Sequence, residues 1–302
     1  MTKTWDVVVV GGTFSEFVFA GLSGWPNPGE EGFAPTMHRE IGGAPITACG
    51  LARLGRKVAL LTCIGSEDYD AFAKRLDSCG VDPSLVYRST GTAVTVSLST
   101  SQDRSFLTWP GANRDLPILL DREDVREKLM QSTHIHVAMM PDHLQAQSLF
   151  GQLREAGCSL SFDVGWDPAW LQDANTVQVL RQTDFFLPNE KEAETISGKS
   201  RPAGMLRWFA EAGLPCAVVK RGGCGSVMIH GGKFYEEPSI AVDVVDTTGA
   251  GDCFDAGFLH SMLAGDAPQD WLRLGNRCGA LSTRALGGID AFPTLQELEE
   301  IV

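Results

Sequence analysis

Short apolar runs alternate with amphipathic stretches along most of this 302-residue chain. The apolar runs have the length of buried strands, and the stretches between them carry apolar residues at helical spacing. This alternation predicts a mostly parallel sheet with helices on both faces, joined by right-handed crossovers. Ligands of such sheets bind beyond the carboxyl ends of the strands. The predicted strands are Val7–Val10, Val58–Ile64, His134–Ala138, Leu160–Val164, Phe185–Leu187 and Ala217–Val219, and the predicted helices include Glu67–Cys79, Asp142–Ala156 and Pro202–Ala212.

Two segments interrupt the alternation. Residues 14–39 contain several prolines and glycines and are predicted to be extended chain around turns. Further on, Thr92–Thr100 and Ser105–Trp109 read as the two strands of a β-hairpin, with a turn at Ser101–Arg104. We therefore expect residues 14–39 and 87–113 to form a small β lid over an α/β domain made of residues 1–13, 40–86 and 114–302.

Composition excludes several classes of partner. The formal net charge of −13 argues against nucleic acid, because an acidic surface repels a phosphate backbone. No apolar run approaches the roughly 20 residues that span a bilayer, and Val7–Val10 is too short for the core of a signal peptide. A soluble, cytoplasmic protein is expected. The eight cysteines form no C-x-x-C pair, which favours buried small side chains over a disulfide framework or a zinc site.

The motif with the clearest chemistry runs from Asp246 to Asp252. Apolar residues of 253–264 share one helical face, so the turn before them lies at a helix N-terminus. Free backbone N–H groups there bind anions, and small residues let a phosphate approach. Asp252 falls in the first helical turn, where its carboxylate can accept a proton from a substrate hydroxyl. An ordinary turn with a helix-start acid is the alternative. The small residues of this turn are Gly249, Ala250 and Gly251.

The segment Asp246–Asp252, followed by Phe254 and Gly257, resembles the second signature of the PfkB (ribokinase-like) family of carbohydrate kinases. The resemblance implies a three-layer α/β/α fold with a small β-sheet lid. It also implies that Asp252 is the catalytic base, that the backbone of Gly249–Gly251 forms the anion hole, and that ATP and Mg²⁺ are the cofactors.

Two further stretches resemble the acceptor side of this family. Gly42 and Gly43, which lead through Pro45 toward Ala52–Gly55, are similar to the first signature, where paired glycines lie against the sugar. Gly111–Asn113, after the hairpin, resembles the end of the lid segment. The acceptor-binding residues that the resemblance implies are Glu16, Gly42, Gly43, Thr47, Asn113 and Asp163.

The nucleotide side is indicated by two later stretches. Asn189–Glu192 matches N-x-x-E, which in the family orients Mg²⁺ largely through water. Lys220–Gly225 is similar to the glycine-rich nucleotide loop. The implied nucleotide-binding residues are Asn189, Lys220, Gly222, Gly223, Gly225 and Asn276, with Glu192 and Asn189 at the magnesium site.

Several of these assignments have plain structural alternatives. Glu192 could be solvated, Lys220 a surface charge, and the glycines part of an ordinary hairpin. Asn276 could be an exposed helical asparagine. Asp246, together with the loop of residues 284–288, matches a place where some relatives bind potassium.

The acceptor side departs from the family pattern. Glu16 stands where an aspartate is usual, and Thr47 replaces an asparagine. Residues 163–168 lack the arginine that fructokinase-like members often carry. The acceptor therefore stays open among ribose, fructose, 2-keto-3-deoxygluconate, a phosphorylated hexose and a nucleoside. The lid-side cations that could hold a phosphorylated acceptor are Arg39, Arg88 and Arg104.

The spacing of the glycines excludes two other nucleotide-binding folds. Gly11–Gly12 follows a strand but lacks the third glycine of a dinucleotide turn. Gly198–Ser200 contains G-K-S, yet the first P-loop glycine is replaced by Ala193. The resemblance thus implies an ATP-dependent sugar kinase, and it implies a homodimer that pairs its lids, as several relatives do. The alternatives are a nucleoside (adenosine-like) kinase, or a non-catalytic sugar-binding regulator, which the presence of Asp252 disfavours.

Overall fold

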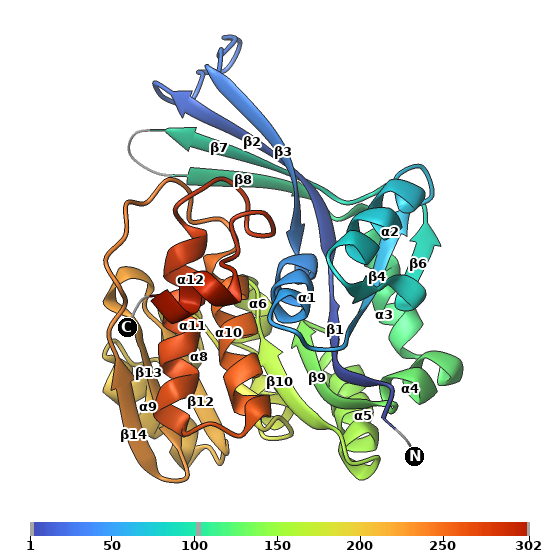
Figure 1. The fold of residues 1–302 in the computed structure, drawn as a ribbon, viewed down its shortest axis with the longest axis vertical. Coiled ribbons are helices and arrows are strands. Elements are labelled where there is room, and N and C mark those ends of the chain that lie inside the picture. The colour runs from blue at the N-terminus through green and yellow to red at the C-terminus, as the bar shows by residue number, and fades with distance from the viewer. Residues whose placement is uncertain (1–2, 101–103, 301–302) are drawn as a thin grey trace.

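The computed structural model describes residues 3–100 and 104–300. Its largest element is a ten-stranded sheet in the order β14-β13-β12-β11-β10-β9-β1-β4-β5, with β6 paired to β4 (Figure 1). Strands β12 to β5 run parallel, whereas β13 and β14 continue the sheet as an antiparallel edge. The strands are β1 Trp5–Gly11, β4 Val58–Gly65, β5 Val81–Asp82, β6 Val86–Ser89, β9 Ser132–Ala138, β10 Ser159–Asp163, β11 Phe185–Phe186, β12 Cys216–Lys220, β13 Ser226–His230 and β14 Lys233–Glu237.

Helices cover both faces of this sheet and make two cores. Successive residues of β1 alternate between them: Val8 and Val10 join one core, Val7 and Val9 the other. The first core is closed by α3 Leu116–Leu120, α4 Glu123–Leu129, α5 His143–Glu155, α6 Pro168–Leu171, α7 Thr176–Leu180, α8 Glu190–Ser197 and α9 Pro202–Glu211. The second is closed by α1 Ala44–Arg53, α2 Tyr69–Ser78, α10 Ala250–Ala264, α11 Pro268–Ser282 and α12 Leu295–Glu300. The predicted three-layer α/β/α fold is confirmed.

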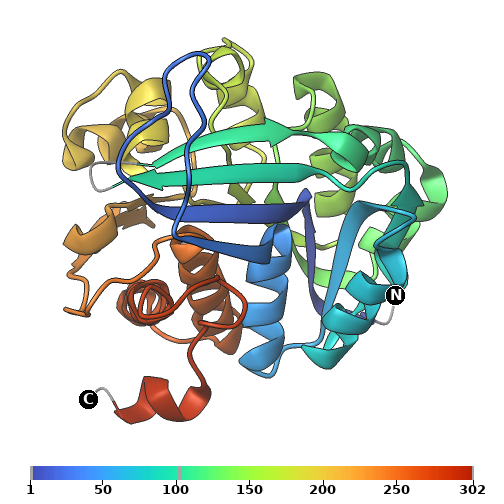
Figure 2. The ribbon, with the colours of Figure 1, turned by 90° about the horizontal axis from the view of Figure 1, so that it is seen from above.

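A second, four-stranded sheet lies across the end of the α/β body (Figure 2). Its order is β3-β2-β7-β8, with bounds β2 Thr13–Leu22, β3 Thr36–Gly43, β7 Val94–Thr100 and β8 Arg104–Trp109. β7 and β8 are the predicted hairpin, but Ser101–Asp103 of its predicted turn lie outside the described residues. Residues 14–39 are more regular than expected, because β2 and β3 pair along most of their length.

The prediction that the cysteines are buried and unpaired is met in part. All eight cysteines are free, and most are buried as predicted, but Cys224 is exposed because it ends the 3₁₀ turn Gly222–Cys224. His134 and His136 lie in β9 and are fully buried. Among the described residues, no helix has both the length and the apolar character that crossing a membrane requires.

Candidate active site

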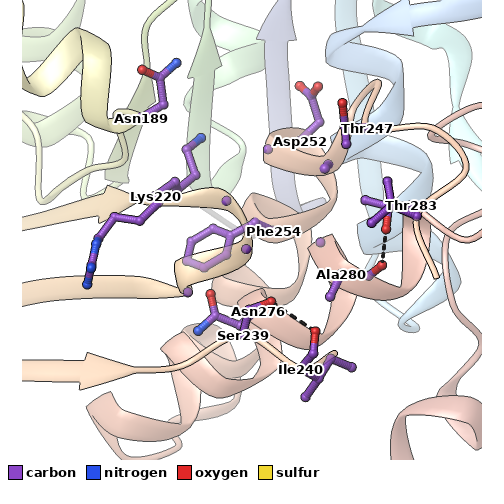
Figure 3. A pocket seen from close by; sticks show the side chains of 18 of the residues that line it. Asn189, Lys220, Ser239, Ile240, Thr247, Asp252, Phe254, Asn276, Ala280 and Thr283 are labelled. Carbon is purple, nitrogen blue, oxygen red and sulfur yellow. Dashed lines mark hydrogen bonds between the residues drawn. The ribbon is translucent and has the colours of Figure 1, made fainter. Parts of the chain in front are cut away.

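The N-terminus of α10 lies at the centre of the candidate site (Figure 3). Gly249 has φ +71°, and a Cβ at this residue would come within 2.6 Å of Ile46 Cδ1. Only glycine therefore fits this turn without strain. Asp252 follows in the first helical turn, and its backbone carbonyl accepts a hydrogen bond of 3.2 Å from the Thr47 hydroxyl. Thr47, predicted on the acceptor side, is thus a buried support of the helix start.

The surroundings of Asp252 make its ionisation sensitive to its neighbours. Burial raises the pKa of Asp252 to about 7, the nearby charge of Asp163 adds to the rise, and Lys220 opposes it. A carboxylate with a pKa near neutrality can both accept a proton and release it.

Lys220 is a largely buried cation, with a side chain 11% exposed, and it is held by two carboxylates. It ends β12, and its Nζ lies 3.1 Å from Asp163 Oδ2 and 3.2 Å from Asp255 Oδ2. Burial opposes its charge, but these carboxylates raise the pKa of Lys220 overall. A Cβ on Gly251 would lie 3.6 Å from this ammonium group. Lys220 therefore flanks the glycine turn, and the surface-charge alternative is wrong.

Asp255 is a site residue that the sequence reasoning missed. It follows Asp252 by three residues on α10, so the two side chains share a helix face, and it is fully buried. On the side of the sheet, His136 Nε2 lies 3.9 Å from Asp255 Oδ2. The other ring nitrogen of His136, Nδ1, forms a hydrogen bond of 2.8 Å with Ser161 Oγ. Burial holds the pKa of His136 far below its usual range. The helical spacing from Asp252 was the only signal for Asp255 in the sequence.

A cavity of about 560 Å³ opens beside Lys220 and Asp252. Gly222 and Gly223 form part of its wall, and a Cβ on either would meet no atom within 4 Å. Their backbone is therefore accessible from the cavity. Gly225, at φ +84°, is required for a different reason, since a Cβ there would lie 2.1 Å from the Glu237 carbonyl oxygen. The apolar lining consists of Val164, Ile240, Ala241, Val242, Val244, Phe254 and Ala280.

Asn189 and Glu192 are fixed by a reciprocal pair of hydrogen bonds. The Asn189 Oδ1 accepts from the Glu192 N–H, and the Glu192 Oε2 accepts from the Asn189 N–H, both at 2.9 Å. This capping box starts α8 on the cavity wall. Glu192 is buried, so the solvated alternative is wrong. Burial raises the pKa of Glu192 to about 7, with a further contribution from Asp163.

Asn276 also lines the cavity and is buried, not exposed. Its Nδ2 donates to the carbonyl oxygens of Glu237 and Pro238, at 2.9 and 3.3 Å. The amide thus joins α11 to the chain that leaves β14. Among the described residues, no three His, Cys, Asp or Glu side chains gather as a metal-binding cluster. A metal held here by Asn189 or Glu192 would need further ligands from phosphates or water.

Glu16 lies on β2 of the lid, where the register pairs it with the buried Thr95, and its charge contributes to the raised pKa of Asp252. A Cβ on Gly42 would come within 2.0 Å of Glu16 Oε1, so the glycine makes room for this carboxylate. Burial raises the pKa of Glu16 to about 7, and the charges of Glu40 and Asp246 add to the rise. Gly43, at φ +81°, begins α1, and a Cβ there would lie 2.4 Å from the Gly12 carbonyl oxygen.

Two other predicted site residues, Asn113 and Asp246, form hydrogen bonds with backbone groups of the chain. The Asn113 Oδ1 accepts from the Thr13 N–H at 3.0 Å, and its Nδ2 donates to the Thr13 carbonyl oxygen at 3.1 Å. Asn113 thereby ties the start of the lid to the body. The Asp246 Oδ1 accepts from the backbone N–H and the hydroxyl of Thr248, and its Oδ2 accepts from the Gly287 N–H at 3.4 Å.

Comparison with known proteins places this chain among sugar kinases. Residues 6–295 match the pfkB family carbohydrate kinase domain. The chain is 29% identical over 280 residues to a 2-dehydro-3-deoxygluconokinase of Bacillus subtilis, covering 87% of this chain and 86% of the relative. It is 30% identical over 280 residues to a fructokinase of Escherichia coli, covering 85% of this chain and 90% of the relative.

Solved structures agree with the fold. The ribokinase of Arabidopsis thaliana, complexed with ribose and ATP, superposes with a TM-score of 0.86 at 24% identity, covering 99% of this chain and 98% of that one. A putative ribokinase II of E. coli, in complex with ATP and Mg²⁺, gives a TM-score of 0.82 at 24% identity, with the same coverage.

Proposed function

The chain belongs to the pfkB family of carbohydrate kinases and is a phosphotransferase that acts on a sugar hydroxyl, and on that premise we propose that it transfers the γ-phosphoryl group of ATP to a primary hydroxyl, with Asp252 as the general base. The observation that carries the proposal is the position of Asp252. Its carboxylate stands at the N-terminus of α10, on the wall of the cavity that Gly222, Gly223 and Lys220 also line.

In this proposal each group has one task. Asp252 accepts the proton of the attacking hydroxyl. The N–H groups of Gly249 and Gly251 at the helix start would stabilise negative charge on the transferred phosphoryl, whereas the Ala250 N–H, also predicted for this role, donates to the Thr247 carbonyl oxygen at 3.2 Å. Lys220 contributes a fixed positive charge next to that turn. No covalent intermediate on the protein is needed, since positioning and electrostatics carry phosphoryl transfer.

The cavity fits a nucleoside triphosphate. Its apolar lining around Phe254, Val242 and Ala280 suits a purine base, and the backbone of Gly222 and Gly223 is open to phosphate oxygens. Asn189 and Glu192 would hold Mg²⁺ near the triphosphate, and the bound ion would offset phosphate charge. Asn276 would act here through the chain around Glu237, which its amide fixes in place.

On the acceptor side, the Glu16 carboxylate, which occupies the space over Gly42, would accept hydrogen bonds from sugar hydroxyls, and Gly43 would shape the turn beside it. Asn113 would hold the lid segment against the body, and Asp163 would hold Lys220. Asp246 organises the loop at Gly287, where a potassium ion would bind beside its carboxylate. Rates measured in K⁺ and in Na⁺ test that role.

The lid is proposed to pair with a second copy of the chain. Side chains of its strands alternate between an inner face, toward the body, and an outer face. We define the outer face as Phe17, Phe19, Met37, Val96, Leu98, Leu107 and Trp109, which the strand register places together. Met37, Leu107 and Trp109 are at least half exposed, whereas Thr95 and Ser97 of the inner face are buried. Apolar side chains that are exposed together on one face are typical of an interaction surface.

The direct test of the proposed function is ADP release from MgATP across a panel of free sugars, sugar acids, sugar phosphates and nucleosides. The wild-type chain should release ADP with at least one acceptor. Asp252→Asn should reduce kcat by about 1,000-fold or more while it still binds ATP, because the amide cannot accept the proton. Near-normal turnover by this variant would remove Asp252 from the role of base. No ADP release with any acceptor would contradict the kinase activity.

A further inference from the structure

Two of the free cysteines are in contact where α1 and α2 pack on the same core. Cys49 is buried in the middle of α1. Cys79 is the residue at which α2 ends, and it is partly exposed. A hydrogen bond joins the two thiol side chains. Both cysteines belong to the second core, so the contact is part of the packing of the two helices.

The backbone around Cys79 accounts for this contact. The Cys79 N–H donates to the Arg75 carbonyl oxygen at 3.2 Å, and α2 ends there. Gly80 then turns the chain with φ +81°, and a Cβ added to it would lie 3.8 Å from Ala52 Cβ. Ala52 follows Cys49 by three residues, so the two share a face of α1. The end of α2 is therefore packed on the helical turn that carries Cys49.

The pair combines a reactive thiol with a protected one. The hydrogen bond from Cys49, together with the positive charges of Arg75 and Arg53, lowers the pKa of Cys79 to about 6, although burial opposes this change. The same hydrogen bond and burial raise the pKa of Cys49. Peroxides react with the thiolate, and access decides which thiolate they reach. Cys79 is thus the thiol that a small oxidant attacks first, and Cys49 is the second thiol in contact with it.

From this geometry we propose that Cys49 and Cys79 are a redox-sensitive pair, which a peroxide converts into a disulfide between α1 and α2. The Cys79 thiolate attacks one peroxide oxygen, the O–O bond breaks, and the leaving hydroxide takes up a proton to become water. Cys79 is then a sulfenic acid. The Cys49 sulfur attacks the Cys79 sulfur, the S–O bond breaks, and the leaving hydroxide takes the Cys49 proton as water.

The electrons balance in this sequence, because two thiols lose two electrons and one hydrogen peroxide becomes two molecules of water. A thiol such as dithiothreitol reverses it by exchange with the disulfide. The inference goes beyond the proposed function and does not depend on it, since the reaction is measured on the protein without any kinase assay.

Other cysteines of the chain provide controls. Cys224 is exposed and would react with peroxide on its own, so Cys224→Ser removes this side reaction. Cys253 and Cys278 are fully buried on α10 and α11, two helices that pack on each other, and they should stay reduced. Cys63 lies on β4 in the first core and should stay reduced as well.

The experiment uses the full chain with Cys224→Ser, treated with hydrogen peroxide, denatured, alkylated with N-ethylmaleimide and digested with trypsin. Cys49 and Cys79 fall in separate peptides, residues 40–53 and 76–88. Alkylation of both cysteines should fall about tenfold relative to the untreated protein. A linked peptide should appear about 2 Da lighter than the two reduced peptides together, and dithiothreitol should separate it.

Variants identify the role of each thiol. Cys49→Ala should stop the reaction at the sulfenic acid of Cys79, which dimedone traps. Cys79→Ser should leave Cys49 reduced. Unchanged alkylation of Cys49 and Cys79 after peroxide would overturn the proposal, and so would a link from Cys79 to Cys63, Cys253 or Cys278. The peptide map of the unsubstituted pair decides between these outcomes even if a variant fails to fold.

Discussion

The ionisation of Asp252 sets a testable pH dependence. A general base works only as the carboxylate, and burial raises the pKa of Asp252 to about 7. The kcat/KM should therefore fall about tenfold per pH unit below pH ~7. Lys220 lowers this pKa, so Lys220→Met should move the acidic limb to higher pH, by about one unit. The profile would be measured at saturating MgATP, from pH ~5.5 to ~9.

Arg221→Met is the matched control, because Arg221 is the next residue and pairs with the Glu236 carboxylate, which is mostly exposed. It should leave the acidic limb where it is in the wild type. A limb that stays in place in Lys220→Met as well would show that Lys220 does not act on Asp252. The thermal midpoint of each variant would be measured too, since loss of Lys220 leaves Asp255 buried without its cation.

At the scale of one element, two glycines at the start of α10 should affect stability and catalytic activity differently when they are replaced. Gly251 lies in the first helical turn, and an added Cβ would meet only the Lys220 Nζ, at 3.6 Å. Gly251→Ala should keep the stability of the fold or raise it by up to ~1 kcal/mol, since alanine favours a helix. It should nevertheless lower kcat about 100-fold, because the methyl group enters the space of the transferred phosphoryl. Thermal melts and initial rates measure the two effects.

Gly249→Ala provides the contrast on the same turn. Its φ of +71° and the Ile46 contact at 2.6 Å should cost about 1–3 kcal/mol of stability, as well as activity. Equal melting temperatures for the two variants would contradict the assigned roles. Full activity in Gly251→Ala would place the phosphoryl group elsewhere.

Elements that follow hydrophobic periodicity could be predicted, and those that depend on distant partners could not. The spacing in residues 142–156 predicts α5 within one residue at each end, because Asp142 also caps the helix. Strands β2 and β3 were seen only as extended chain, since their ladder joins segments on either side of a proline-containing turn. The hairpin β13–β14 was missed in part because residues 233–237 are mostly polar and half-exposed.

In the candidate site, too, residues with a local sequence signal could be predicted, and residues placed by distant contacts could not. Motif residues such as Asp252 and Glu192 could be named, because their spacing is local. Asp255 carries no local signal, and only the packing of α10 on β12 brings it to Lys220. The exposure of Lys220 and Asn276 was predicted wrongly for that reason. Asp163 and Asp255 enclose the Lys220 side chain, which is 11% exposed, and Asn276 is buried where it bonds to the end of β14.

At the scale of the whole molecule, the lid sheet exposes apolar side chains on the face turned away from the body. An ordinary surface sheet exposes polar side chains there. Thr95, Ser97 and Val18 of the inner face are buried, whereas the apolar side chains Met37, Leu107 and Trp109 of the outer face are at least half exposed. Such exposure is unfavourable for a monomer. Pairing of the outer faces of two copies would bury this surface and restrain both lids over their acceptor sites. A stable interface of this kind removes about 800 Å² per partner from water.

We therefore expect the wild-type chain to sediment as a dimer at micromolar concentration. Leu107 is 73% exposed on the outer face, where it lies on the edge strand β8 opposite Val96, and Leu107→Glu should yield monomers because a charge would be buried in an apolar contact. Leu144→Glu makes the same change at a leucine on α5 that is 76% exposed, and it should remain a dimer. Sedimentation velocity distinguishes these species. A monomeric wild type, or a dimeric Leu107→Glu, would contradict pairing through the lid, while monomers whose KM for the acceptor has risen would show that the second copy holds each lid in place.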